Sequence, residues 1–354
     1  MAAAAPEPEA TPLPRLFPFV FFGCWNRPGE IGGTKILPRD VVAHAVGEMA
    51  GAIQTIIIGG DNVYPRPGDK TKAHDPTVFD EGMSLYTRLG KPIVLAFGNH
   101  NVVTYEAKKP KVRPENEDVV EIKSMLNYQR TRVGFVPEDK TYFVKSYAEG
   151  VDVVVLDTNI MDDAEMLAWF DETVRHILST GRQYYVVQHE PYFTAKETEK
   201  DGIKKQKFGS LTNGSAFLEI MFRYGAPIAV LCADTHYYQH GVIERIGTEG
   251  PPIHQIIVGT GGADPDAHVT GFDSHDFEGG YKLTKIKEDP GFGFLHVMAP
   301  DVSAARFVHV APWPARPAHK GGRYAPRRRR STQNTRRRRH AGGGRSRRTR
   351  RSSK

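Results

Sequence analysis

Short apolar runs alternate with longer amphipathic stretches along most of the chain, beginning at Phe17. Runs rich in β-branched and aromatic residues are typical of buried strands, whereas apolar residues that recur every three or four positions predict helices. This alternation predicts a layered α/β domain. The predicted strands are Phe17–Phe22, Thr55–Ile58, Pro92–Ala96, Thr141–Tyr147, Val151–Leu156, Gln183–Gln188, Ile228–Leu231, His240–Arg245, Ile253–Val258, Phe292–Met298 and Ala305–Val310. The predicted helices are Pro38–Ala52, Thr77–Arg88, Asp118–Thr131, Asp163–Leu178 and Ser215–Arg223.

The stretch from Asn159 to Leu178 shows how apolar spacing and a capping residue together define a helix. Asp162 or Asp163 would cap its first turn, because a carboxylate accepts hydrogen bonds from the free backbone N–H groups there. The last strands of the chain follow one another without helices between them, which predicts antiparallel pairs and therefore mixed sheets. We expect the helix to pack on the core through Met166, Leu167, Phe170, Val174 and Ile177.

Composition narrows the class of protein. The chain has 354 residues and 39% hydrophobic content, enough to bury the core of one large domain or two ordinary ones. Its two cysteines, Cys24 and Cys232, cannot form a disulfide scaffold, which favours a reducing, intracellular setting. The apolar run Phe17–Trp25 is too short to cross a bilayer and follows an acidic, Pro-rich leader, so we expect neither a membrane span nor a signal peptide.

The net charge of +7 combines two segments of opposite sign. Residues 313–354 hold 15 Arg and 2 Lys with no acidic residue, whereas the rest of the chain holds 31 basic against 41 acidic residues, a net charge of −10. We therefore expect three parts: a disordered leader over 1–14, a folded domain over 15–312 and a disordered, arginine-rich tail over 313–354. The tail would bind nucleic acid or another polyanion without sequence readout, direct the chain to the nucleus or tether it to an anionic surface. The alternative is a solvated tail with no specific partner.

Polar residues suited to metal binding follow five of the predicted strands. Each strand ends in a short turn with Gly, Asp, Asn or His, and in open α/β sheets such strand ends line the ligand crevice. Asp, Asn and His supply oxygen and nitrogen donors for metal ions. One such turn alone is ordinary turn chemistry, but five in order predict a metal site. The turns are Gly23-Cys24-Trp25-Asn26, Gly60-Asp61-Asn62-Val63-Tyr64, Gly98-Asn99-His100-Asn101, Gln188-His189-Glu190-Pro191 and Ala233-Asp234-Thr235-His236.

The order of these turns resembles that of the calcineurin-like metallophosphoesterase superfamily, which includes the purple acid phosphatases. G-D-N-V-Y followed by G-N-H carries the resemblance, which extends over about Leu16 to Val310. It implies a four-layer α/β/β/α sandwich with two mixed sheets. It also implies a site with two divalent or trivalent metal ions, of Fe, Zn or Mn.

Five residues match the family's site position by position. Asp61 matches the carboxylate that bridges both ions, and Asn99 matches the amide-oxygen ligand of the second ion. His100 matches the histidine that faces the scissile phosphate and protonates or stabilises the leaving oxygen. His189 matches the lone histidine on the second ion, and His236 matches the last histidine, which reaches the first ion.

Three turns depart from the family pattern. Cys24 and Asn26 stand where the family usually has Asp and often His, Asp234 replaces a His, and Asn101 replaces the acid that usually follows G-N-H. Cys24 and Asp234 still offer metal donors, and a Cys24 thiolate would favour Zn or Fe over Mg or Ca. Cys24 packed as a small buried residue behind Trp25 is the alternative, and whether Asn26 ligates is left open.

The resemblance implies hydrolysis of phosphate esters by two ions and a metal-bound hydroxide, with the choice between monoesters and diesters open. The alternative is a catalytically weakened fold that acts as a scaffold or nucleic-acid-binding protein through its tail.

Four further features bear on the site. Val258–Gly262 resembles the Gly-rich turn that closes this family's site, and Trp25 is expected to form a wall of the cleft. Tyr64 occupies the place of a tyrosinate ligand in purple phosphatases, although tyrosine also occurs there without that role. The lysine-rich segment Thr194–Gly209 would form either a basic lid near phosphate or a solvated surface loop.

Overall fold

The computed structural model describes residues 12–27, 37–64, 76–101, 120–133, 140–200, 203–263, 266 and 272–311. Most of the acidic leader and the whole arginine-rich tail lie outside these residues, as do the residues between the described ranges. The described residues belong to one unit, Met1–Trp313. Within them, no helix is long and apolar enough to cross a membrane.

The first sheet has five strands in the order β15-β14-β1-β2-β3. β1 pairs in parallel with β2, and β2 with β3, whereas β14 and β15 run antiparallel to their neighbours. The strands β2 and β3 are buried and rich in β-branched residues, as expected for parallel strands in a sheet that is covered on both faces. The strands are β1 (Phe19–Phe22), β2 (Thr55–Ile58), β3 (Ile93–Leu95), β14 (Phe292–Val297) and β15 (Ala305–Ala311).

The second sheet has eight strands in the order β12-β13-β10-β11-β9-β6-β5-β4. Its centre, from β5 to β11, is parallel, and antiparallel strands complete both edges. The strands are β4 (Phe143–Ser146), β5 (Val151–Val155), β6 (Gln183–Val187), β9 (Val230–Cys232), β10 (Tyr238–Arg245), β11 (Ile253–Val258), β12 (Ser274–Phe277) and β13 (Tyr281–Asp289).

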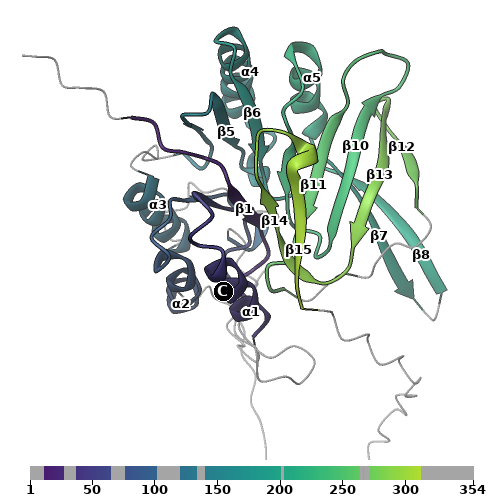
Figure 1. Cartoon of the computed structure of the whole chain (residues 1–354). Helices are drawn as coiled ribbons and strands as arrows, with labels where there is room; N and C mark the ends of the chain where they lie inside the picture. The colour runs from purple at the N-terminus through teal and green to yellow at the C-terminus, as the bar shows by residue number, and fades with distance from the viewer. Residues whose placement is uncertain are drawn as a thin grey trace, which may run out of the picture. The chain divides into compact units, whose positions relative to one another are not determined.

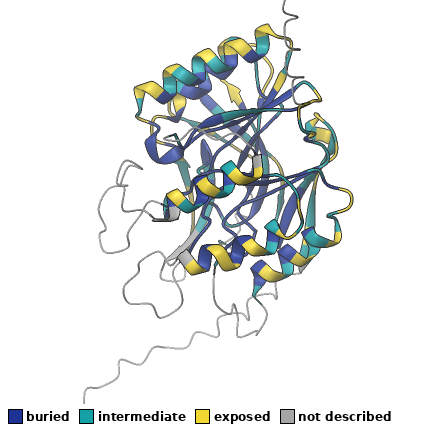
Figure 2. Ribbon diagram, turned by 90° about the vertical axis from the view of Figure 1, so that its left-hand side faces the viewer, coloured by how far each residue is buried: buried dark blue, intermediate teal, exposed yellow. Residues whose placement is uncertain are grey.

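Five α-helices cover the outer faces of the two sheets (Figure 1). The helices α1 (Pro38–Glu48), α2 (Pro76–Thr87) and α3 (Val120–Val133) pack on the first sheet, and α4 (Ala164–Ser179) and α5 (Gly214–Tyr224) pack on the second. Figure 2 shows each helix with its buried side toward the strands and its exposed side outward. Asp163 caps α4 by accepting hydrogen bonds from the backbone N–H groups of Glu165 and Met166.

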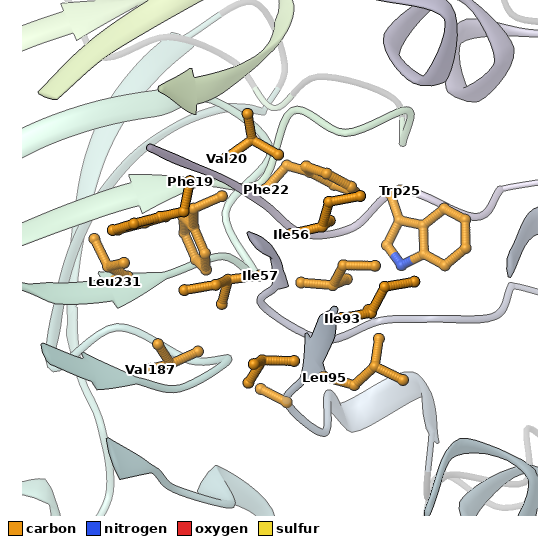
Figure 3. Packing of buried hydrophobic residues seen from close by; sticks show 14 of the residues in the cluster. Phe19, Val20, Phe22, Trp25, Ile56, Ile57, Ile93, Leu95, Val187 and Leu231 are labelled. Atoms are coloured by element: carbon orange, nitrogen blue, oxygen red, sulfur yellow. The ribbon is translucent and has the colours of Figure 1, made fainter. Parts of the chain in front are cut away.

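Two hydrophobic clusters lie between the layers and pack them together. The larger cluster lies between the two sheets and continues under α1, α2 and α3, and the other lies between the second sheet and α4 and α5. In Figure 3, Phe19 and Ile57 of the first sheet lie near Val187 and Leu231 of the second. The layer order is therefore helices, sheet, sheet, helices, which confirms the α/β fold class with two mixed sheets.

The structure corrects one sequence expectation about the lysine-rich segment. Thr194–Gly209 belongs to an antiparallel hairpin of β7 (Phe193–Lys200) and β8 (Ile203–Ser210), so it is not a surface loop. The strands β12 and β13 were also not predicted. All four carry many charged or polar residues, which gives them the composition of loops although their backbones pair.

Candidate metal centre

The five polar turns meet at the carboxyl ends of β1, β2, β3, β6 and β9. Backbone hydrogen bonds join neighbouring turns: Cys24 N–H donates to the carbonyl of Gly60 at 3.1 Å, and Ala233 N–H donates to the carbonyl of His189 at 2.8 Å. The turns belong to two different sheets, and they lie together because the sheets face each other. The order of turns in the sequence thus corresponds to one cluster in space.

Three of the site residues adopt a left-handed backbone conformation. The φ angles are 50° at Cys24, 53° at Asp61 and 54° at Asp234. Residues other than glycine, asparagine, aspartate and histidine rarely adopt this region, at a cost of about 1–2 kcal/mol. Such strain clusters at functional sites, where it holds a side chain in an otherwise unfavourable place. Each of the three residues comes just after a strand of the site.

Asp61 lies at the centre of the cluster and is 1% exposed. Its Oδ2 accepts a hydrogen bond from Tyr64 OH at 2.7 Å, and its Oδ1 accepts one from the backbone N–H of His100 at 3.0 Å. Burial alone would raise the pKa of Asp61, but the charges of His189 and His100 and the hydrogen bond from Tyr64 hold that pKa well below its usual value. The carboxylate therefore stays ionised inside the protein.

His189 is fully buried and oriented by the main chain. Its Nδ1 lies 2.7 Å from the carbonyl oxygen of Gly59, so Nδ1 carries the proton and Nε2 faces the cluster. Nε2 lies 3.2 Å from Oδ1 of Asp61 as an ion pair that lacks hydrogen-bond geometry. Burial would lower the pKa of His189, yet the carboxylates of Asp61 and Asp234 raise it to about 9.

Two groups of donor atoms share Asp61. In the first group, single ligand atoms of Cys24, Asp61 and His236 all lie within 4.8 Å of one another. In the second, His189 Nε2 lies 3.2 Å from Asp61 and 3.9 Å from Oδ1 of Asp234.

Asn99 precedes His100, whose backbone N–H donates to Asp61, and the buried Oδ1 of Asn99 has no hydrogen-bond partner among the described residues. An unsatisfied buried oxygen costs about 1–3 kcal/mol. Binding a cation would remove this cost, so the donor set fits two metal ions.

The thiol of Cys24 lies inside this cluster. Its Sγ is 3.9 Å from Oδ2 of Asp61, and Cys24 is fully buried. Burial and the nearby carboxylates of Asp61 and Asp234 raise the pKa of the thiol well above its usual value. In the metal-free chain the thiol is therefore protonated, and a bound cation would be needed to hold it as a thiolate.

Tyr64 lies beside the first donor group and contacts two of its members, Asp61 and His236. Besides its hydrogen bond to Asp61, its OH lies 3.5 Å from Nε2 of His236, and its ring packs on that of His100 with centroids 4.6 Å apart. Burial and the neighbouring Asp61 raise the pKa of this phenol well above its usual value. Tyr64 is therefore a protonated phenol in the metal-free chain.

Asn26 and Trp25 point away from the cluster. The Nδ2 of Asn26 donates to the carbonyl oxygens of Asn62 and Val78 at 2.8 Å each, and its Oδ1 accepts from Arg39 at 2.5 Å. These bonds use the amide fully, so Asn26 joins β1 to α2 instead of facing a metal. Trp25 is fully buried in the larger cluster, where Figure 3 shows it beside Ile93, so the expected cleft wall was wrong.

The turn after β3 places His100 at the opening of the site. The Oδ1 of Asn101 accepts a hydrogen bond from Gly98 N–H at 2.7 Å, so Asn101, which stands where the family usually has an acid, closes the turn. The His100 side chain is 26% exposed, and its Nε2 lies 3.9 Å from Oδ2 of the buried Asp61. His100 can thus contact a molecule that approaches the cluster from solvent.

Two further contacts complete the site. The Gly-rich turn packs against the Cys24 turn, because Gly261 N–H donates to the carbonyl of Gly23 at 3.0 Å and Ala263 N–H to that of Cys24 at 2.8 Å. From β7, Lys196 Nζ lies 3.4 Å from Oδ2 of Asp234 and 3.6 Å from Oδ2 of Asp266.

Asp266 also accepts a hydrogen bond from the backbone N–H of His236. Sequence analysis did not identify Asp266, since it follows no predicted strand directly.

The comparisons with known proteins agree with this architecture. The sequence matches no family model and no curated protein. Among solved structures, a purple acid phosphatase from yellow lupin (Lupinus luteus) seeds is similar with a TM-score of 0.50 and 14% identity, covering 80% of this chain and 49% of that protein. A dimetal phosphatase from Danio rerio has a TM-score of 0.47 and 13% identity, covering 69% of this chain and 87% of that one.

This chain therefore spans about half the length of the lupin phosphatase, and the similarity concerns the fold. The two mixed sheets and the outer helices are the features that this fold similarity covers. The chain therefore shares its fold with the lupin purple acid phosphatase.

Proposed function

We propose that the chain is a metal-dependent hydrolase of phosphate esters, with two metal ions that share Asp61. The observation that carries this proposal is the position of the buried, ionised Asp61 between two groups of donors. Cys24 and His236 would hold the first ion, and Asn99, His189 and Asp234 the second. Because a thiolate is a soft ligand, Fe or Zn suits the first position, and Mn is the third candidate metal.

Two bound ions would supply Lewis acidity and a more acidic water for attack on phosphorus. The protein's own groups would orient the reaction. Tyr64 and the His100 main chain fix the two oxygens of Asp61 by hydrogen bonds. The partly exposed His100 ring would hold a proton for the leaving oxygen, a contribution of about 10²–10⁴ to the rate.

The experiment measures metal content and hydrolysis on the same samples. Purified protein, loaded with Fe, Zn or Mn, would be assayed with p-nitrophenyl phosphate and bis-p-nitrophenyl phosphate, which separates monoesterase from diesterase activity. Asp61→Ala should lose both metal and hydrolysis, whereas His100→Ala should keep the metal and lose about 10²-fold or more in kcat. His176→Ala, an exposed residue of the distant α4, is the matched control.

Two results would refute this proposal. One is a metal-loaded wild-type protein that hydrolyses neither ester. The other is an Asp61→Ala variant with the metal content and rate of the wild type.

A further inference from the structure

The hairpin of β7 and β8 has two chemically different faces. Ala195 and Phe208 are paired across it on one face: Ala195 is buried in the cluster under the second sheet, and the Phe208 ring stacks on His275 at 3.7 Å. Side chains alternate along a strand, so the next pair, Lys196 and Lys207, lies on the other face. The hairpin thus presents two paired lysines away from its apolar side.

A cavity of about 190 Å³ lies against this second face. Its wall includes Asp234, whose Oδ2 faces Lys196 at 3.4 Å while its Oδ1 lies 3.9 Å from Nε2 of His189. One carboxylate therefore separates the cavity from the candidate metal centre. The residues of the wall that carry charge or a hydroxyl group are Glu190, Thr194, Lys196, Lys207, Ser210 and Asp234.

The size of the cavity restricts what it can hold. Pockets for drug-sized ligands measure about 300–1,000 Å³, which is more than this cavity offers. At about 30 Å³ per water molecule, 190 Å³ corresponds to roughly six waters. The space fits one phosphate group.

The wall holds two acidic and two basic residues, and one of its lysines is available to an anion. Lys196 is already paired with Asp234 and Asp266, but Lys207 pairs with no acidic group in the described part of the chain. Like charges directly opposite each other across a hairpin repel and destabilise it, so an anion between Lys196 and Lys207 would stabilise the pair. The hydroxyl groups of Thr194 and Ser210 also lack hydrogen bonds among the described residues, so both can donate to such an anion.

We propose that this cavity is a subsite for a second phosphate group of the substrate, so that the preferred substrates are phosphate esters with two neighbouring phosphate groups. The inference rests on the proposed function, because the first phosphate occupies the metal centre. Lys207, Thr194 and Ser210 bind the second phosphate, and Lys196 positions Asp234 between the two. The wall has two negative charges that oppose this binding, that of Glu190 and that of Asp234, and Lys196 is paired with the second.

The test compares phenyl diphosphate with phenyl phosphate, which differ by the second phosphate alone. Wild-type protein should show at least about tenfold higher kcat/KM for the diphosphate, and Lys207→Glu should reduce that ratio about tenfold, the effect of losing a hydrogen bond between charged groups. Lys207→Gln, a milder change, should reduce it less. Glu190→Gln should increase the ratio.

The control is Lys205→Glu, because Lys205 is exposed on the same strand but does not line the cavity. If Lys205→Glu and Lys207→Glu lower the ratio equally, the effect comes from the overall electrostatic field of the hairpin, and the subsite is refuted. If Glu190→Gln lowers the ratio while Lys207→Glu leaves it unchanged, the cavity binds a cation and the proposal is wrong.

Calorimetric binding of methylenediphosphonate separates this inference from the proposed function, since binding needs no turnover. Tighter binding than that of methylphosphonate, lost in Lys207→Glu, would support the subsite even in a protein without hydrolase activity. Equal binding of the two phosphonates to the wild type would overturn it.

Discussion

Replacement of Gly82 by alanine should destabilise the protein although it places a better helix former in α2. In an exposed helix the change would stabilise by about 1 kcal/mol. Here a Cβ atom on Gly82 would lie 2.2 Å from Oδ1 of Asn26 and 2.4 Å from its Cγ, closer than any real contact allows. The Asn26 amide would therefore have to move.

That movement would break buried hydrogen bonds. The amide of Asn26 makes three of them, to Asn62, Val78 and Arg39, and none of these groups can reach water in its place. Each lost bond costs about 1–3 kcal/mol when its partner stays buried. After subtraction of the helix gain, we expect Gly82→Ala to lower the free energy of unfolding by about 3 kcal/mol.

Urea unfolding followed by circular dichroism would measure this change, and Asn26→Ala supplies the second arm of a double-mutant cycle. Without the amide, Gly82→Ala should stabilise by about 1 kcal/mol, so the coupling between the two positions should be about 4 kcal/mol. A neutral or stabilising effect of Gly82→Ala in the wild-type background would refute the reasoning.

Two other predictions concern stability. Asp163→Ala should lower the free energy of unfolding by about 1 kcal/mol through loss of the α4 cap, while Asp162→Ala changes it little; equal effects in urea titrations would contradict this. Burial, and then the neighbouring His254 and Lys287, lower the pKa of His240 from 6.5 to about 4. The unfolded chain therefore binds more protons than the folded chain between these pH values, and stability falls as the pH drops through this window. In the wild type, the free energy of unfolding should fall by about 3 kcal/mol across this window because of His240, and His240→Gln should remove that fall. Parallel curves of unfolding free energy against pH for variant and wild type would show the prediction to be wrong.

Much of the fold could be predicted because its central strands are apolar and its turns are distinctive. The strand Ile253–Val258 was predicted with its observed limits, since both faces of β11 are buried. The hairpin of β7 and β8 could not be predicted in this way. One of its faces carries lysines, so its sequence lacks the apolar run that identifies a buried strand.

The candidate site was predicted as a set of turns, but the direction of each side chain was not. Asn26 and Asp61 both follow a strand in a polar turn. The Asn26 amide nevertheless donates to the backbone of α2, whereas the Asp61 carboxylate lies at the centre of the donor cluster. Such directions depend on tertiary neighbours, for example the close approach of Gly82. The pairing of Lys196 with Asp234 joins positions 38 residues apart, and the sequence holds no local signal for it.

The left-handed backbone at Cys24, Asp61 and Asp234 also limits how this centre can change its ligands over evolution or by design. Residues that tolerate that conformation can be exchanged there at low cost, and among metal donors these are aspartate, asparagine and histidine. A threonine would be a severe mismatch, because β-branched side chains clash with the backbone in this region. Variant libraries aimed at a new metal preference should therefore sample Asp, Asn and His at these positions and avoid β-branched residues.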